Sequence, residues 1–125
     1  MNMILRFGLL SGLLSVILGA FGAHALRSVL DERLQGVFET AVRYQMYHSL
    51  LLLGIYLLYR HHASVWLRRA GYSVIVGIVL FSGSLYALCL TQQSWFGPVT
   101  PFGGLCLMAG WLMALCAVWK GQDHE

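Results

Sequence analysis

Long, continuous apolar runs dominate this sequence and leave few folds open to it. A membrane-spanning helix needs about 20 mostly apolar residues, and the chain of 125 residues supplies four runs close to that length. These runs do not alternate polar and apolar residues, as the strands of a membrane barrel do. We therefore predict an all-α fold: an integral-membrane bundle of four transmembrane helices, forming a single domain over residues 1–125. The predicted spans are residues 4–26, 43–60, 69–91 and 101–120.

Composition argues for the same class. The chain is 58% hydrophobic and 10% charged, whereas soluble domains are about 25% charged. A chain this short cannot bury so much apolar surface inside a globule. The net charge of +3 comes from eight Lys and Arg residues that flank the apolar runs. We therefore expect contact with the lipid bilayer and no binding of nucleic acid.

The segment between the first two runs has a different character. Apolar residues recur there at helical spacing, with charged residues between them. This pattern predicts an amphipathic helix over about residues 29–42 that lies at the membrane interface and runs into the second span. Ser28 or Asp31 is placed to cap its start. Glu39 and Arg43 are four residues apart, so they can pair on one side of the helix.

The distribution of cationic residues predicts the orientation. With both termini inside, five of the eight Lys and Arg residues lie on the inner side and three on the outer side. The outer three share their segment with three acidic residues. The positive-inside rule then favours a cytoplasmic N-terminus and a cytoplasmic C-terminus.

The first run ends in "GAFGAH" at residues 19–24. Ala23-His24-Ala25 matches the A-x-A pattern of a signal-peptide cleavage site. The preceding run is long enough to span a membrane. We therefore favour a retained first span over a cleaved leader.

Small residues recur along the first, third and fourth runs, mostly at steps that keep them on one side of a helix. In lipid, such residues let helix backbones approach closely. The pattern predicts tight helix packing, and it leaves open whether the partner lies within the chain or on another subunit. The predicted packing residues are Gly8, Gly12, Ser15, Gly19, Ala23, Gly77, Gly103, Gly110 and Ala114.

Polar side chains within the runs gather toward the outer half of the predicted membrane. At about 1.5 Å per residue, His48 lies roughly 18 Å above the inner surface and Ser84 about 22 Å. An ionisable residue inside a span is a functional candidate. For His48 we favour a neutral imidazole that only holds the helices in register, with a haem or metal ligand, or contact with a proton, quinone or lipid headgroup, as alternatives. The candidate polar cluster comprises His24, Tyr44, Gln45, His48, Ser82, Ser84, Tyr86 and Thr100, with Gln45, His48, Ser84 and Tyr86 converging inside the bundle.

No residue pattern indicates catalysis or cofactor binding. The sequence has no CxxC pair, no Cys/His metal spacing and no recognisable nucleophile, paired-carboxylate or phosphate-loop arrangement. Cys89, Cys106 and Cys116 lie in apolar stretches and are expected to be buried small hydrophobes. Thr100 followed by Pro101 predicts the cap and first residue of the last helix. We predict no catalytic residues, no metal and no cofactor.

Four segments resemble a known family. "GAFGAH" at 19–24, "YQMYH" at 44–48, "FSGSLY" at 81–86 and "TPFGG" at 100–104 are similar to those of the YgdD-like family. Its members are small bacterial inner-membrane proteins of unknown function, with relatives in mitochondria. The resemblance extends over nearly the whole chain and implies a four-helix, multi-pass protein of the bacterial inner membrane. It supplies no substrate, catalytic residue or cofactor.

The sequence is compatible with three kinds of function. We favour a non-enzymatic protein that acts as a homo-oligomer or as an accessory subunit of a membrane complex. The alternatives are a carrier or channel for a small solute or proton formed by an oligomer, and a lipid- or quinone-binding protein. A membrane enzyme is least favoured, because the acidic residues are confined to the predicted interfacial helix and the C-terminal tail.

Overall fold

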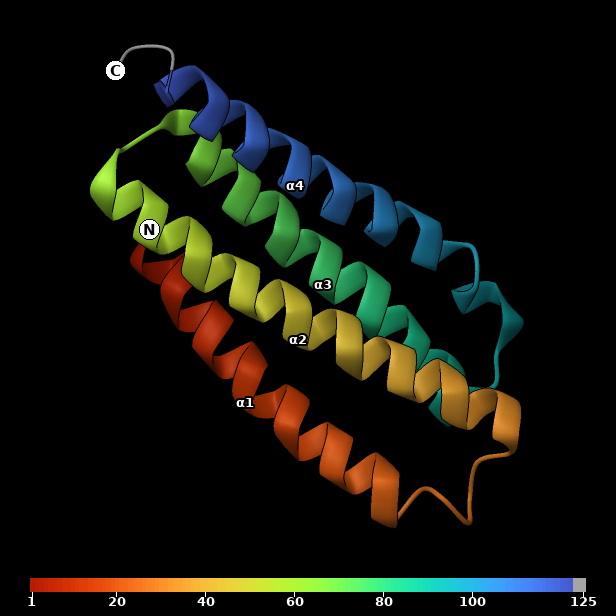
Figure 1. Cartoon of the computed structure of the whole chain (residues 1–125). Helices are drawn as coiled ribbons and strands as arrows, with labels where there is room; N and C mark the ends of the chain where they lie inside the picture. The colour runs from red at the N-terminus through yellow and green to blue at the C-terminus, as the bar shows by residue number, and fades with distance from the viewer. Residues whose placement is uncertain (123–125) are drawn as a thin grey trace.

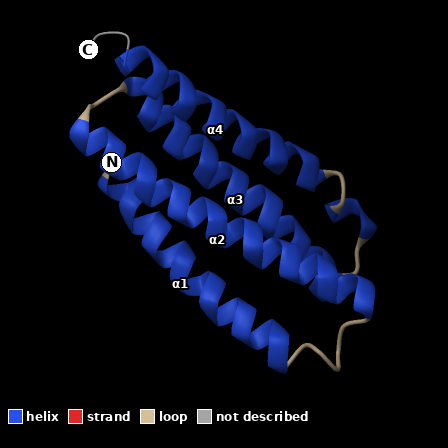
Figure 2. Cartoon of the chain, in the orientation of Figure 1, coloured by secondary structure: helices blue, strands red, loops and turns tan. Residues whose placement is uncertain are grey.

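The computed structural model describes residues 1–122, which form four long helices joined by short connections. The order is α1 (Asn2–His24), α2 (Glu32–His61), α3 (Val65–Thr91), a 3-10 turn η1 (Ser94–Phe96) and α4 (Val99–Gln122) (Figure 1). Over these residues the structure contains helices and loops and no strand (Figure 2). The prediction of an all-α fold is confirmed.

The helices lie side by side in chain order, each antiparallel to the one before (Figure 1). Contacts run mainly from α1 to α2, from α2 to α3 and from α3 to α4. α1 touches α3 only lightly, and α1 shares no substantial contact with α4. The four helices therefore form an open array, in which α1 and α4 are the two outer members.

The buried positions follow a heptad repeat. Successive steps of four and three residues carry the buried side of α2 along its whole length, and this spacing produces close antiparallel helix packing. The buried positions of α2 in this series are Leu34, Phe38, Ala41, Gln45, His48, Leu52 and Ile55. A matching series on α4 comprises Gly103, Leu107, Gly110, Ala114 and Ala117.

Residues 29–42 do not form a separate helix. Residues from Glu32 onward belong to α2, which continues without a break to His61. The heptad explains this difference, because Leu34, Phe38 and Ala41 keep the same buried side as the residues that follow them. The segment thus runs without a break into the second apolar run, and its predicted place at the membrane interface is not confirmed.

Local details of that segment agree with the sequence. Asp31, and not Ser28, caps α2, since its carboxylate accepts a hydrogen bond of 2.8 Å from the Leu34 backbone N–H. The predicted pair of Glu39 and Arg43 is present, with Oε2 and Nη2 3.6 Å apart. By contrast, α4 begins at Val99, so Thr100 lies inside its first turn and is not its cap.

The small residues of α1 and α4 pack within the chain. A Cβ on Gly8 would lie 3.0 Å from the Cβ of Leu52, so α1 closely approaches α2 there. A Cβ on Gly103 would meet the backbone of Phe81 in α3. Ala23 departs from the predicted stripe, because it is exposed. Its place against α2 is taken by Gly22, which packs on the ring of Phe38.

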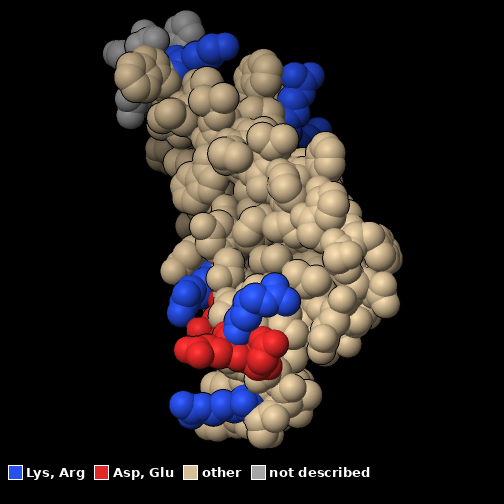
Figure 3. All heavy atoms as spheres, turned by 90° about the vertical axis from the view of Figure 1, so that its right-hand side faces the viewer, with Lys and Arg blue, Asp and Glu red and all other residues tan. Residues whose placement is uncertain are grey.

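Three segments are long and apolar enough to cross a membrane: α1, α3 and Ser94–Lys120, which contains most of α4. α2 is not one of them: charged residues occupy its start, and Gln45 and His48 interrupt the apolar residues that follow. Figure 3 shows charged side chains grouped toward the two ends of one face, with a broad uncharged belt between them. This arrangement is typical of an integral membrane protein that crosses the bilayer several times.

Candidate functional site

A hydrogen-bonded network centred on Gln45 joins three helices at membrane depth. Gln45 is 6% exposed. Its amide nitrogen donates to the backbone carbonyl of Ser11 in α1 at 2.9 Å, and its Oε1 accepts from the hydroxyl of Tyr86 in α3 at 2.6 Å. The amide thus satisfies polar groups on both neighbouring helices, where an unpaired group would be costly.

Two serine hydroxyls extend this network. Ser49 Oγ lies 2.6 Å from the carbonyl oxygen of Gln45 and 2.8 Å from Ser11 Oγ. A hydroxyl has one proton to donate. Both contacts are satisfied when Ser49 donates to the carbonyl of Gln45 and accepts from Ser11.

His48 forms a second polar contact, between α2 and α4. Its Nδ1 lies 2.7 Å from the carbonyl oxygen of Tyr44, and its Nε2 lies 3.0 Å from the indole nitrogen of Trp111. A carbonyl only accepts and an indole N–H only donates. His48 is therefore the neutral tautomer with its proton on Nδ1, and both ring nitrogens have partners.

Ser82 and Ser84 hold α3 to its two neighbours. Ser82 donates to the carbonyl of Ala41 in α2 at 2.8 Å. Ser84 Oγ lies 2.6 Å from Thr100 Oγ1 in α4 and 2.9 Å from the carbonyl of Phe81. These hydroxyls satisfy one another and nearby carbonyls between the helices.

The predicted cluster is thus divided. Gln45 meets Tyr86 between α2 and α3, and Ser84 meets Thr100 between α3 and α4. His48 pairs with Tyr44 within α2 and with Trp111 of α4. The expected convergence of Gln45, His48, Ser84 and Tyr86 is seen only for Gln45 and Tyr86. His24 lies outside the network, since it is exposed at the end of α1, two residues beyond the buried Gly22.

Sequence reasoning missed three members of these contacts: Ser11, Ser49 and Trp111. A signal for Trp111 was available, because an indole N–H in the interior of a span needs an acceptor. Ser11 lies at a heptad step from Gly8 and Ser15 on the packed side of α1. Ser49 is the residue directly after His48, on the same side of α2.

These contacts join neighbouring helices through paired polar groups. Each network hydroxyl, amide and ring nitrogen described above has at least one protein partner. Among residues 1–122, no group of three His, Cys, Asp or Glu side chains is placed to hold a metal ion. The cysteines differ from one another, since Cys89 is buried and Cys116 is exposed, which corrects the expectation that all three are buried.

A groove runs between α1 and α3 beside the Gln45 network. Its volume is about 300 Å³, and Gln45 of α2 lies at its base. The groove is lined mainly by apolar side chains, because α1 and α3 diverge above α2 and leave their facing sides uncovered. The lining residues are Phe7, Leu10, Ser11, Leu14, Leu18, Gln45, Ile78, Val79, Gly83 and Tyr86.

These features define a small multi-pass membrane protein whose intramembrane polar groups pair with one another. Residues 18–104 match the family described as "Protein of unknown function (DUF423)". The chain is 43% identical over 120 residues to the UPF0382 membrane protein SH2409 of Staphylococcus haemolyticus, covering 96% of this chain and 98% of that protein. It is 38% identical over 125 residues to the UPF0382 inner membrane protein YgdD of Escherichia coli K12, covering 97% of this chain and 95% of that one.

The chain therefore belongs to the DUF423 family of UPF0382 membrane proteins, and the resemblance found in its four segments is confirmed. No solved structure matches it.

Proposed function

We propose that this chain is a non-enzymatic inner-membrane protein that holds another transmembrane segment, either of a second copy or of a complex in which it is an accessory subunit. The observation that carries this proposal is the groove between α1 and α3. Helices that face only lipid need no groove of this kind. A groove beside the Gln45 network, whose polar groups already pair with one another, can hold a packed partner helix.

The groove has the properties of a helix-packing surface. From Phe7 to Leu18 it follows one side of α1 for about 16 Å, or three helical turns. Its opposite wall contains Gly83, around which a Cβ would meet nothing within 4 Å. Bare backbone of this kind lets a second helix approach closely and gain dispersion contacts.

The proposal includes α2 as the fourth span. Val42 of α2 contacts Gly19 of α1, and Leu52 contacts Gly8, so α2 runs beside α1 through the same depth. Arg43 is close to the outer end, and a long cationic side chain there can extend to the interface. Side chains on a helix lean toward its N-terminus, which for α2 is that same end.

The proposed orientation places both termini in the cytoplasm. The N-terminus, the α2–α3 connection and the end of α4 lie at one end of the array (Figure 1). Four cationic residues of that end, Arg60, Arg68, Arg69 and Lys120, lie near Tyr56, Tyr59 or Trp66. Cation-rich ends with aromatic neighbours favour the cytoplasmic interface.

Orientation can be tested by labelling single cysteines in a variant that lacks the three native ones. Ser28→Cys lies in the α1–α2 connection and Ala63→Cys in the α2–α3 connection, and both positions are exposed. A membrane-impermeant thiol reagent added to intact spheroplasts should label position 28 and not position 63. Equal labelling of both positions would contradict four spans, and the reverse result would invert the orientation.

The partner function can be tested by cross-linking in native membranes. Val79 lines the groove, whereas Val76 is a similarly exposed residue of α3 outside it. Val79→Cys should give a defined cross-linked product that Val76→Cys does not, and adding Gly83→Leu should abolish it. Gly54→Leu, also at a position with nothing within 4 Å, should not. A chain that remains monomeric and gives no product at Val79 would overturn the proposal.

A further inference from the structure

A group of basic side chains lies at the end of the array that holds the N-terminus and the α2–α3 connection. At the upper end of Figure 3, Lys and Arg side chains appear without Asp or Glu, whereas both kinds gather lower down. The acidic residues within 1–122 all belong to the opposite end, and they are Asp31, Glu32 and Glu39. We name the exposed basic group the basic patch, and it comprises Arg60, Arg68, Arg69 and Lys120.

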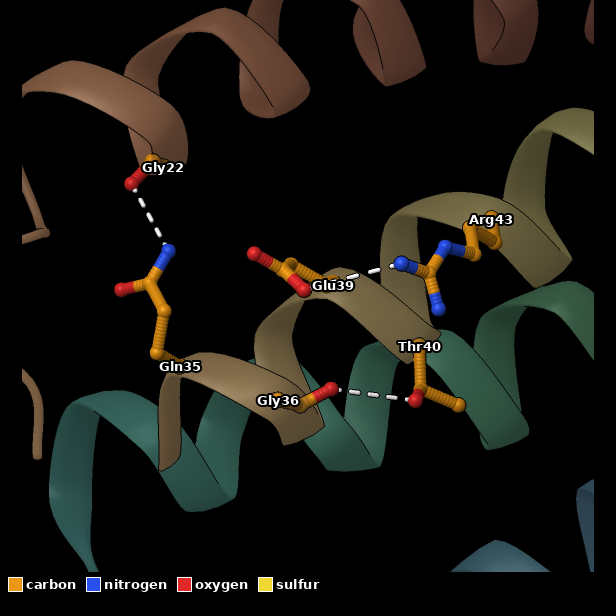
Figure 4. Close-up of polar contacts among 6 residues, drawn as sticks. All are labelled: Gly22, Gln35, Gly36, Glu39, Thr40 and Arg43. Atoms are coloured by element: carbon orange, nitrogen blue, oxygen red, sulfur yellow. Dashed lines mark hydrogen bonds and ion pairs between the residues drawn. The ribbon is translucent and has the colours of Figure 1, made fainter. Parts of the chain in front are cut away.

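The opposite end differs from the basic patch, because its charges are mixed. There the Glu39 carboxylate lies beside the Arg43 guanidinium, with Oε2 and Nη2 3.6 Å apart (Figure 4). Within the described residues, the cations of the basic patch have no carboxylate beside them. A ligand that carries negative charge is therefore favoured at the basic patch.

Two of the four cations share one aromatic ring. The guanidinium carbon of Arg69 lies 4.9 Å from the ring centre of Trp66, and the ammonium nitrogen of Lys120 lies 5.6 Å from it. Arg69 belongs to α3 and Lys120 to α4, so the indole gathers charges from two helices. Each cation is attracted to the ring, but the two cations repel each other. We name Trp66, Arg69 and Lys120 the Trp66 site, and an anion beside both cations would offset their repulsion.

Arg69 and Lys120 also retain their hydrogen-bond donors. Arg60 and Arg68 each donate to a tyrosine hydroxyl at 3.1 Å. Residues 1–122 supply no such acceptor to the side chains of Arg69 and Lys120, which contact the indole ring instead. A guanidinium carries five N–H donors and an ammonium three. The Trp66 site can therefore form charge-assisted hydrogen bonds with the anionic oxygens of a ligand.

The Trp66 site lies where two apolar segments reach the membrane surface. Trp66 is the second residue of α3, and Lys120 ends the segment Ser94–Lys120, and both segments are long and apolar enough to cross a membrane. Tryptophan favours this interface between hydrocarbon and headgroups. Val65 and Trp119 precede Trp66 and Lys120 in the sequence, and they are 57% and 65% exposed. The site therefore has apolar side chains beside its cations, which suits a lipid better than a soluble anion.

We propose that the Trp66 site binds an anionic phospholipid whose headgroup carries no cation, of the phosphatidylglycerol kind. The phosphate accepts hydrogen bonds from the Arg69 guanidinium and the Lys120 ammonium, and the acyl chains extend along exposed apolar side chains of α3 and α4. A choline or ethanolamine headgroup has the same phosphate but brings a further cation next to these two, so it binds less well. This inference is independent of the groove between α1 and α3, because it uses only the surfaces of α3 and α4.

The test is competitive lipid retention by the whole protein, measured by native mass spectrometry after delipidation. The probes are phosphatidylglycerol and phosphatidylcholine with identical acyl chains, and glycerol phosphate as the soluble anion. Retention of phosphatidylglycerol should exceed that of phosphatidylcholine by about tenfold or more, because each cation beside an anionic headgroup contributes about fivefold. Equal retention of the two lipids would overturn the proposal. So would displacement of phosphatidylglycerol by an equal concentration of glycerol phosphate, because it would indicate a site for soluble anions.

Matched variants separate the Trp66 site from general surface charge. Arg69→Gln and Lys120→Gln should each lower the preference about fivefold. Arg6→Gln removes a charge from the same end, on α1, and should keep the preference. Trp66→Leu changes no charge and should still lower the preference, because the ring gathers the two cations.

All four positions are exposed, so the fold should persist in each variant, and circular dichroism checks this. The full preference in Arg69→Gln and Lys120→Gln would overturn the proposal. An equal loss in Arg6→Gln would also overturn it, because only the net charge of that end would then matter. The full preference in Trp66→Leu would show that the indole does not build the site, which contradicts the proposal as well.

Discussion

The hydroxyl of Tyr86 donates to Oε1 of Gln45 across 2.6 Å, and the amide nitrogen of Gln45 donates to the carbonyl of Ser11 across 2.9 Å. One side chain of α2 therefore links α2 to both α1 and α3. In a membrane this matters because helices there associate through packing and hydrogen bonds, without a hydrophobic driving force between them.

Gln45→Leu should lower the free energy of unfolding in bicelles by about 1 kcal/mol, because two interhelical hydrogen bonds of roughly 0.6 kcal/mol each are lost. Tyr86→Phe removes only one of them and should cost about half as much. A double-mutant cycle of the two variants should give a coupling energy near 0.6 kcal/mol. A coupling energy of zero would mean that the two side chains do not interact.

His48→Leu should weaken the association of α2 with α4. The ring accepts a hydrogen bond from Trp111 at 3.0 Å, and an interhelical bond of this kind contributes about 0.6 kcal/mol. Trp111→Phe is the matched variant, since it keeps an aromatic ring and removes the donor. Unfolding in bicelles should show similar losses for the two variants and no further loss for the double variant. Full stability of both would show that this contact does not hold the helices together.

The tautomer of His48 can be observed directly. Nδ1 faces the Tyr44 carbonyl and Nε2 faces the Trp111 indole N–H, so the proton belongs on Nδ1. Nitrogen-15 NMR of the reconstituted protein at neutral pH should show a protonated Nδ1 and an unprotonated Nε2. The Trp111→Phe variant should shift the Nε2 resonance, and a protonated Nε2 in the unmodified protein would contradict the described geometry.

Two adjacent glycines of α4 offer a sharp test of the packing against α3. A Cβ on Gly103 would meet the backbone of Phe81, whereas a Cβ on Gly104 would lie 3.8 Å from the Phe81 ring. Gly103→Ala should therefore destabilise the protein by about 1–3 kcal/mol through overpacking. Gly104→Ala should be neutral or stabilising by up to about 1 kcal/mol, because alanine favours helix. Thermal unfolding of the two variants in one detergent gives the comparison, and equal effects would show that α3 and α4 do not approach closely at Gly103.

The sequence was sufficient for the helical class, because continuous apolar runs have few structural outcomes in lipid. It also predicted the Glu39–Arg43 pair and left the cap open between Ser28 and Asp31, both of which depend on spacing within one helix. The interfacial helix predicted over about residues 29–42 is not confirmed, and there charge and hydrophobic register disagree. The charges of residues 32–43 suggested a surface helix, but the buried positions Leu34, Phe38 and Ala41 join this segment to α2.

Contacts between helices were harder to predict than the helices themselves. Depth along the membrane placed His24, His48 and Ser84 in one outer zone, but depth does not state which side of a helix a residue occupies. The heptad repeat does show which side a residue occupies. His24 lies two residues past the buried Gly22 and is therefore on another side of α1. The polar residues are divided among different helix contacts because of the order in which the helices lie. No single segment of the sequence encodes that order.

The open array also has a consequence for biogenesis. Since each helix packs mainly on the one made just before it, every new helix finds its partner already present as it leaves the ribosome. We expect α2, whose charges make it the least suited to enter lipid alone, to insert as a hairpin with α1, with Gln45 reaching the Ser11 carbonyl during that step. Because no substantial contact between α1 and α4 must wait for the end of synthesis, the last helix to emerge completes the array without rearranging those before it.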